Sequence, residues 1–416
     1  MLVGWKVTTL SLDVASVRYR ALLPILGLED RDISGRLFAD HAGCHLDGLD
    51  ALVFVKSFTP ADLELARTAR QRGIPVVLEL CDCIFVENYA GKSGPDASAA
   101  VFLRMAELAQ GIVVTTDPLR EIVAAETGGR PRIDVIPDGV DSAAAQRRAA
   151  VVVQGAVAER AARLPPRAAP RVAPRPPRKQ RLLKRVRNWL FPRQAVRNQT
   201  VPPTPTVPEP PTPCATSATA KRILWYGNHG AAHARFGMLD LLDIRDALEA
   251  VAREHDVVLV VVSDNEDKYR DHIAPLAIPT EYHRWSHATV DRELQRASVV
   301  VVPNSLEVFS RCKSANRAVF SLQHGVPVIA TRTAALEGLA ECVVFDDFLH
   351  GLRRYLGDTN AARDDVRKSR DVIERLFGLT AIASAWSAVL ESVVGQADRS
   401  ATRPVSPARP ASVQAA

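Results

Sequence analysis

Short apolar runs alternate with longer amphipathic stretches over two blocks of the chain. The apolar runs are rich in β-branched residues and too short for helices, so we expect them to be buried strands. Alternating strands and helices are typical of an α/β fold in which helices cover both faces of a parallel sheet. The predicted strands of the first block are Trp5–Thr9, Ala51–Val55, Val76–Leu80, Gly111–Thr115 and Ile133–Ile136. Those of the second block are Arg222–Tyr226, Val257–Ser263, Thr280–Trp285, Val299–Pro303, Val326–Thr331 and Cys342–Phe345.

The helices predicted between these strands follow from the helical spacing of their apolar positions. The first block has one from about Arg18 and others at Ala61–Arg72, Val101–Ala109 and Pro118–Glu126. The second block has helices at Phe236–Glu254, Asp267–Ala274, Val290–Ala297 and Ala315–His324, then from Asp347, Arg363 and Ala381. We therefore expect two doubly wound domains, residues 1–142 and 220–396, separated by a linker at 143–219 and followed by a disordered tail at 397–416.

The segment between the two blocks is basic and rich in proline. It carries 13 Lys and Arg residues and no Asp or Glu between Arg160 and Pro208, so the net charge of +6 for the whole chain leaves −7 elsewhere. Of the 28 prolines, 14 lie between Pro165 and Pro213. Proline removes backbone donors, and such a composition buries little apolar surface, so we expect a long disordered linker.

One proline-free stretch of this linker, residues 179–191, has the pattern of a basic amphipathic helix. Its apolar residues fall on one helical face, and Lys and Arg occupy much of the remainder. That pattern is typical of a helix lying on an anionic membrane surface. A solvated linker and a phosphate-binding segment are the alternatives. We expect no nucleic-acid partner, because Trp189 has only Phe191 as an aromatic neighbour.

Length and composition exclude several classes of protein. The 416 residues, 47% of them hydrophobic, suit two globular domains. No apolar run approaches the roughly 20 residues of a membrane span, and no signal peptide is recognisable. We therefore expect a cytoplasmic protein, with residues 179–191 as a candidate contact to the inner face of the membrane. The six cysteines predict reduced thiols, and Cys81 and Cys83 form the one close pair, so we expect no metal site.

The first group of candidate binding residues opens the helix predicted after Val299–Pro303. Ligands of doubly wound domains bind at the carboxyl ends of the strands. Neither domain has a G-x-G-x-x-G or Walker A sequence, which disfavours a dinucleotide dehydrogenase and a P-loop kinase. The free amides of the helix start, with the side chains around them, suit a diphosphate. These side chains are Lys313, Ser314, Asn316 and Arg317. The alternative is that Ser314 only caps the helix and the cations are solvated.

The other candidates lie in three loops at strand ends. The loop after the first strand of the second block offers a backbone that approaches a ligand closely and side-chain donors. In the first block, two arginines suit an anionic acceptor or the donor phosphates, and an aspartate suits a general base or a hydroxyl ligand. The alternative interpretations are structural: the glycine forms a tight turn, the arginines supply charge at a helix start, and the aspartate belongs to a turn. The candidates are Gly227, Asn228 and His229 in the second domain, and Ser16, Arg18, Arg20 and Asp82 in the first.

Three stretches resemble signatures of GT-B glycosyltransferases, specifically the family-4-like set known as glycosyl transferases group 1. Residues Ile133–Asp141 resemble the signature v-i-P-n-G-v-D. The stretch from Leu294 to Glu307 resembles l-a-x-a-D-v-x-v-x-P-S-x-x-E, with Ser298 in place of the usual Asp. Residues Lys313–Thr331 resemble K-x-x-N-R-x-x-x-A-x-x-x-G-x-P-V-I-A, a variant of the donor-binding helix. The resemblance covers about residues 1–142 and 220–395.

The chain departs from this family in three respects. Most members carry two glutamates around the donor; Glu307 matches the first, whereas Phe320 stands at the second position. The spacing from Glu307 to Gly325 is five residues longer than usual, with Arg311, Cys312 and Lys313 in the extra turn. Family members commonly bind the diphosphate through an Arg/Lys pair in the first loop of the second domain, but no such pair follows Gly227. Lys313 and Arg317 are the candidates to supply that positive charge.

The resemblance implies two Rossmann-like domains facing a cleft and a glycosyltransferase of hexosyltransferase type. Such an enzyme moves a sugar from a nucleotide-diphosphate donor to a glycan or lipid-linked hydroxyl acceptor, as in polysaccharide biosynthesis. The implied mechanism needs no metal or other cofactor. Glu307 would hold sugar or ribose hydroxyls, while Lys313 and Arg317 would neutralise the leaving diphosphate. The alternatives are a non-catalytic nucleotide-sugar-binding scaffold, favoured by the missing glutamate, and a sugar-nucleotide epimerase.

Overall fold

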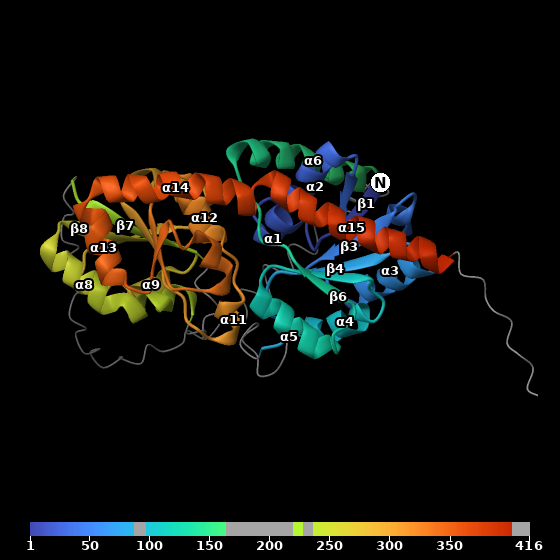
Figure 1. Cartoon of the computed structure of the whole chain (residues 1–416), viewed down its shortest axis with the longest axis horizontal. Helices are drawn as coiled ribbons and strands as arrows, with labels where there is room; N and C mark the ends of the chain where they lie inside the picture. Colours follow the sequence, from blue (N-terminus) through green and yellow to red (C-terminus); the bar gives the residue numbers. More distant parts are fainter. Residues whose placement is uncertain (87–96, 164–218, 228–235, 402–416) are drawn as a thin grey trace, which may run out of the picture.

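The computed structural model describes residues 1–86, 97–163, 219–227 and 236–401, and contains two parallel six-stranded sheets. Figure 1 shows the two sheets side by side along the long axis, with α14 and α15 running along one side of both. All strand pairings among the described residues are parallel. The predicted fold class is confirmed. Residues 164–218 of the basic proline-rich insert, including 179–191, lie outside the described residues.

The N-terminal sheet has the strand order β2-β1-β3-β4-β5-β6. Its central strands are buried on both faces, which explains their continuous apolar sequences. In β3, Leu52 and Phe54 pack into one apolar cluster, while Val53 and Val55 pack into another on the opposite face. The strands are β1 (Leu2–Lys6), β2 (Ser34–Phe38), β3 (Ala51–Val55), β4 (Val76–Leu80), β5 (Gly111–Val114) and β6 (Arg132–Val135).

Helices and helical turns join the strands of the N-terminal sheet. The longest is α3, which starts with a capping box between Thr59 and Asp62 and a proline in its first turn. The set comprises α1 (Ala15–Val17), η1 (Arg18–Leu22), α2 (Leu23–Leu28), η2 (Glu29–Arg31), η3 (Gly43–Leu46), α3 (Pro60–Gln71), α4 (Ala97–Ala106) and α5 (Asp117–Thr127). The edge strand β2 was not predicted from the sequence. It is short and contains Gly35 and Arg36, so it lacks the apolar run of a central strand.

The C-terminal sheet has the strand order β12-β11-β10-β7-β8-β9. Its strands are β7 (Lys221–Tyr226), β8 (Val257–Ser263), β9 (Thr280–Arg284), β10 (Val299–Val302), β11 (Val328–Ala330) and β12 (Val343–Phe345). Its helices and helical turns are η4 (Gly237–Ile244), α8 (Arg245–Glu254), α9 (Glu266–His272), α10 (His287–Arg296), α11 (Val308–Arg311), α12 (Asn316–Gln323), η5 (Ala334–Leu339), α13 (Phe348–Gly357) and α14 (Thr359–Phe377). The helix predicted at Phe236–Glu254 is thus a 3-10 segment followed by an α-helix.

The last helix, α15 (Leu379–Ala401), crosses to the N-terminal domain, although the sequence placed it in the second domain. Trp386 is fully buried and stands edge-on to Trp5 of β1, with ring centroids 4.9 Å apart. By length and composition, Thr359–Ala397 could cross a membrane, and half of its apolar window is buried inside the protein. That buried face includes the residues of α15 that complete the N-terminal core, which is the behaviour of a core helix.

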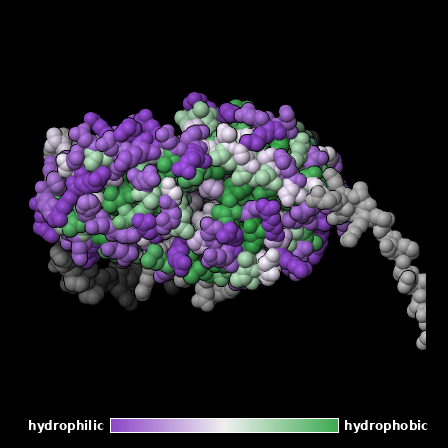
Figure 2. Space-filling model, viewed as in Figure 1, coloured by the Kyte–Doolittle hydropathy of each residue, from purple (hydrophilic) through white to green (hydrophobic). Residues whose placement is uncertain are grey.

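Helix α6 (Ala143–Arg163) occupies the start of the range predicted as linker. Its residues Ala145, Ala149 and Val153 are buried in the same apolar cluster as Trp5 and Trp386. The N-terminal domain therefore extends past residue 142 and is completed by two helices, α6 and α15. Figure 2 shows mostly hydrophilic side chains over the C-terminal domain in this view and more hydrophobic surface beside α15.

Candidate functional site

A cavity of about 780 Å³ lies between the two domains, at the carboxyl ends of both sheets. Loops following β1, β3, β4 and β6 line one side, and loops following β7, β8, β9, β10 and β11 line the other. This is where doubly wound domains bind ligands. The predicted site residues that line it are Ser16, Arg18, Arg20, Asp82, Gly227, Lys313, Ser314, Asn316 and Arg317.

The N-terminus of α12 opens into this cavity. The N-cap residue is Ala315, and no side chain caps the helix. The alternative that Ser314 serves as the cap is therefore wrong. Asn316 and Arg317 occupy the first turn, so the cavity receives the unpaired amides and the partial positive charge of the helix start.

Asp82 binds two lysines at the entrance to α12. Its carboxylate pairs with Lys313 of the other domain at 2.6 Å and also pairs with Lys56. Burial by itself raises the pKa of Asp82, but the ammonium groups of Lys313 and Lys56 outweigh it and hold that pKa well below its usual range. A carboxylate so strongly held in its charged form is a weak proton acceptor. Its position favours charge pairing over the general-base role that the sequence suggested.

Arg317 contributes a cation with no recorded ion pair among the described residues. Its guanidinium lies 6.0 Å from the ring centroid of Trp225, and a Cβ at Gly227 would stand 3.5 Å from it. Buried Asp240 faces the same space, and burial raises the pKa of its carboxyl to about 6 despite the influence of Arg317. Among the described residues Arg317 forms no ion pair with Asp240, so its guanidinium is available to an anionic ligand.

Arg20 is buried, which corrects its predicted role of gripping a ligand. Its guanidinium pairs with Glu79 at 2.5 Å and with Asp138 at 3.2 Å, and only 1% of its surface is exposed. Ser314 in turn donates a 2.5 Å hydrogen bond to Asp138 across the domain interface. Arg20 thus positions a carboxylate that holds the start of α12, and it acts through Asp138.

The charge of Arg18 is also paired within the protein. Arg18 pairs with Asp141 at 2.9 Å, and its Nη1 lies 2.9 Å from Nε2 of His287 on the other domain. Burial and Arg18 lower the pKa of His287, so the imidazole is neutral and accepts the hydrogen bond. Ser16 of α1, two residues before Arg18, lines the cavity and forms no hydrogen bond through its side chain with the described residues. The N-terminal loop therefore offers Ser16 to a ligand more readily than its two arginines.

Three cations gather close to the start of α12. Lys56 and Lys313 both pair with Asp82, and Arg317 stands in the first turn of the helix. A diphosphate placed there would meet these cations and the amides of the helix start. Among the described residues, no group of three or more His, Cys, Asp or Glu is arranged to hold a metal ion.

Of the remaining predicted residues, one lies away from this arrangement and two fall outside the described part of the chain. Glu307 precedes α11, is exposed, and is not among the residues that line the cavity. Asn228 and His229 lie outside the described residues. Phe320, which stands where the family has its second glutamate, does line the cavity. The structure thus presents an aromatic ring where the resemblance implied a carboxylate.

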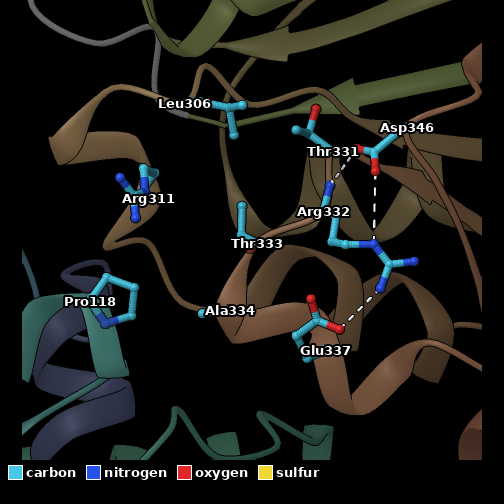
Figure 3. A pocket seen from close by; sticks show the side chains of 9 residues that line it. All are labelled: Pro118, Leu306, Arg311, Thr331, Arg332, Thr333, Ala334, Glu337 and Asp346. Atoms are coloured by element: carbon cyan, nitrogen blue, oxygen red, sulfur yellow. Dashed lines mark hydrogen bonds and ion pairs between the residues drawn. The ribbon is translucent and has the colours of Figure 1, made fainter.

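A second cavity of about 470 Å³ adjoins the first. Thr331 and Thr333 line both cavities, and Pro118 of α5 forms the wall on the N-terminal side. Figure 3 shows Arg332 held between Glu337 and Asp346, with Leu306 and Arg311 across the opening. The distances from Arg332 to these carboxylates are 3.0 and 3.8 Å. The charges of this second cavity are therefore largely balanced internally.

The residues of the main cavity that sequence reasoning missed include Lys56, Asp138, Asp141, Asp240 and His287. Lys56 directly follows β3, so its place at a strand end was a usable signal. Asp138 and Asp141 stand within the signature stretch Ile133–Asp141. Asp240 and His287 give no such signal, because only the packing of the domains brings them to the cavity.

The chain thus has two tandem sheets of parallel strands with a cavity between their carboxyl ends, and its last helix returns to the first domain. Solved structures superpose on this fold. Sucrose-phosphate synthase from Thermosynechococcus elongatus superposes with a TM-score of 0.56 at 13% identity, covering 95% of this chain and 100% of that one. HepE from Anabaena in complex with UDP-glucose gives a TM-score of 0.54 at 12% identity, covering 94% of this chain and 100% of that one.

The chain has a GT-B fold. At sequence identities this low, the likeness establishes the fold of the chain and not its activity. Its sequence matches no known protein-family profile and no curated protein. The GT-B chain spans 54% of the chain of TarM and 57% of a chain of the GtfA/B complex, at TM-scores of 0.48 and 0.45.

Proposed function

We propose that this protein is a glycosyltransferase that moves a sugar from a nucleoside-diphosphate donor to a hydroxyl acceptor. One observation carries the proposal: the uncapped start of α12, with Arg317 on it and Lys313 before it, faces an interdomain cavity. The complexes of HepE with UDP-glucose, and with UDP and glucose, add support because HepE shares the fold. The donor class is carried over from that likeness.

In this mechanism the chain binds the diphosphate and stabilises it as a leaving group. The amides of α12 and the cations Lys313 and Arg317 would neutralise the charge that develops when the bond to the sugar breaks. The contacts Lys313–Asp82 and Ser314–Asp138 join the domains around the cavity, at 2.6 and 2.5 Å. A closed cavity excludes water, whose attack on the donor is the competing reaction. We propose that no metal or other cofactor takes part.

The binding step is tested by thermal unfolding of the purified protein with UDP, GDP, ADP or CMP. A ligand at 100 times its dissociation constant stabilises the folded protein by about 2.7 kcal/mol. We expect one nucleoside diphosphate to raise the melting temperature and the others to have little effect. The monophosphate of the base that binds then tests whether the second phosphate is needed.

Variants of the two cations locate that binding to α12. Replacing Lys313 or Arg317 with Ala removes a charged partner worth about 1.5–3 kcal/mol, so we expect nucleotide affinity to fall roughly 10- to 100-fold. Lys368→Ala is the matched control, because Lys368 pairs with Asp365 on α14, away from the cavity. Unchanged affinity in both cavity variants would contradict the assignment of the diphosphate site.

A non-catalytic nucleotide-sugar-binding scaffold is the second candidate. Two observations favour it: Phe320 replaces a glutamate in the cavity, and Glu307 is exposed outside it. The scaffold and the enzyme bind the same ligand, so only turnover separates them. Release of nucleotide from the matching nucleotide sugar, measured with glycan and lipid-linked alcohols as acceptors, would establish the enzyme. Binding without release in every case would establish the scaffold.

The finer assignments belong to the same proposal. We propose a hexose as the transferred sugar, a glycan or lipid-linked acceptor in polysaccharide biosynthesis, and a cytoplasmic location. Composition and the family resemblance support these assignments. Binding of the full-length protein to anionic vesicles tests the proposed membrane contact through residues 179–191.

A further inference from the structure

Two cysteines from different domains meet beside the cavity. Cys83 follows β4 in the N-terminal domain, and Cys312 follows α11 in the C-terminal domain. Both are buried, and both belong to one apolar cluster although they lie far apart in the sequence. Figure 1 shows α11 on the side of its domain that faces the N-terminal domain. Neither thiol has a part in the proposed glycosyl transfer.

The residues next to each cysteine hold the two segments together. Asp82 pairs with Lys313 at 2.6 Å, so the neighbour of Cys83 binds the neighbour of Cys312. Thr116 of the N-terminal domain donates a 3.3 Å hydrogen bond to the backbone carbonyl of Cys312. Cys312 and Lys313 belong to the extra turn that distinguishes this sequence from the family it resembles. The extra turn thus forms a contact between the domains.

The environment of the pair makes one thiol the nucleophile. A hydrogen bond from Cys312 lowers the pKa of Cys83 to about 7, opposed by burial and helped by the amides of Phe85 and Val86. The same interaction and burial raise the pKa of Cys312. The charged groups facing the pair are Asp82, which opposes ionisation of Cys83, and Arg311 and Lys313, which act on Cys312. Near neutral pH a large fraction of Cys83 is therefore thiolate, while Cys312 keeps its proton.

We propose that Cys83 and Cys312 are a redox-active pair whose disulfide joins the two domains. The oxidant is a peroxide. The Cys83 thiolate attacks the peroxide, takes one oxygen to become a sulfenic acid, and releases water once a proton is taken up. The Cys312 thiol then attacks that sulfur, forming the S–S bond and releasing a second water. In sum, two thiols and one hydrogen peroxide give one disulfide and two waters.

The disulfide would fix the cavity in its closed form. It would tie the loop after β4 to the turn that opens α12, where Asp82 and Lys313 already meet. Opening and closing of the domains would then stop until a thiol reductant restores the pair. The proposal concerns the chemistry of these thiols and does not depend on the proposed function.

Peptide mapping of the full-length protein tests the proposal. The protein is treated with hydrogen peroxide, its remaining thiols are alkylated, and it is digested without reductant. We expect one cross-linked peptide pair containing Cys83 and Cys312, which disappears on reduction, and a higher melting temperature of the oxidised protein. Cys44→Ser is the matched control, because Cys44 is exposed on the N-terminal domain and should leave the cross-link unchanged.

Two variants separate the roles of the thiols. Cys312→Ser keeps a hydrogen-bond donor beside Cys83 but removes the resolving thiol, so dimedone should trap the sulfenic acid on Cys83. In Cys83→Ala neither the disulfide nor the dimedone adduct should form. In the native protein the rate of cross-linking should rise about tenfold between about pH 6 and 8, following the thiolate fraction of Cys83. Recovery of both cysteines as free thiols, or pairing of Cys83 with Cys81, would overturn the proposal.

Discussion

Trp386→Ala tests whether α15 completes the core of the N-terminal domain. The indole is fully buried against Trp5, with ring centroids 4.9 Å apart and the planes at 66°. Its neighbours in the same cluster include Ile382, Leu390 and Val393 on α15 itself. Removal of the ring would leave a cavity between the helix and the sheet.

The expected loss of stability follows from this burial. Replacing a buried Trp or Phe with Ala costs about 3–5 kcal/mol, and the edge-on ring pair places Trp386 in the upper part of that range. For a domain of roughly 150–250 residues each kcal/mol lowers the melting temperature by about 2–4 °C. We therefore expect the N-terminal domain to melt some 10–20 °C lower than in the native protein.

Differential scanning calorimetry measures this change, because it resolves separate transitions of the two domains where they occur. Trp386→Phe should lower the melting temperature less than Trp386→Ala, since it keeps a ring against Trp5. Val157→Ala on α6 is the surface control, since Val157 is 47% exposed and its change should stay within about 0.5 kcal/mol. A shift below about 2 °C in Trp386→Ala, or a shift confined to the C-terminal domain, would refute the packing of α15 on the N-terminal sheet.

Two further predictions concern the carboxylates of the cavity. Asp82→Asn removes the carboxylate that Lys56 and Lys313 share, so we expect the free energy of unfolding, measured in urea, to fall by about 1–3 kcal/mol. Because Asp82 competes with a diphosphate for Lys313, we expect tighter nucleotide binding by titration. Weaker binding would contradict this competition. Asp240 has a folded-state pKa of about 6, above its unfolded value, so its contribution to stability is full below about pH 4 and is lost as the pH rises through 6. Asp240→Asn should therefore stabilise the protein by up to about 3 kcal/mol at pH 7 and by little at pH 4, and equal effects at both pH values would contradict the raised pKa.

The central strands could be predicted from the sequence almost residue for residue. Ala51–Val55, Val76–Leu80 and Val257–Ser263 are strands with the predicted bounds. They are buried on both faces, so each is a continuous apolar run that local sequence displays directly. The edge strand β2 was not predicted, because it is only partly buried and lacks a continuous apolar run. Helix α6 was not predicted, because its composition resembles that of the neighbouring linker.

The candidate site was predicted in part. Lys313, Ser314, Asn316 and Arg317 do gather at a helix start facing the cavity, as their position after a buried strand indicated. Their partners could not be predicted, because an ion pair such as Lys313–Asp82 joins residues of different domains. For the same reason Arg20 was taken for a ligand-binding residue, although it is buried.

The sequence by itself determined the two α/β domains and the strand ends at which a ligand site forms. Those features depend on local periodicity and on the residues that follow each strand. Only the tertiary structure decided that α15 returns to the first domain, that Glu307 stands outside the cavity, and that Cys83 meets Cys312. These outcomes depend on how two folded domains pack against each other, and contacts between residues so distant in the chain leave no periodic pattern in it.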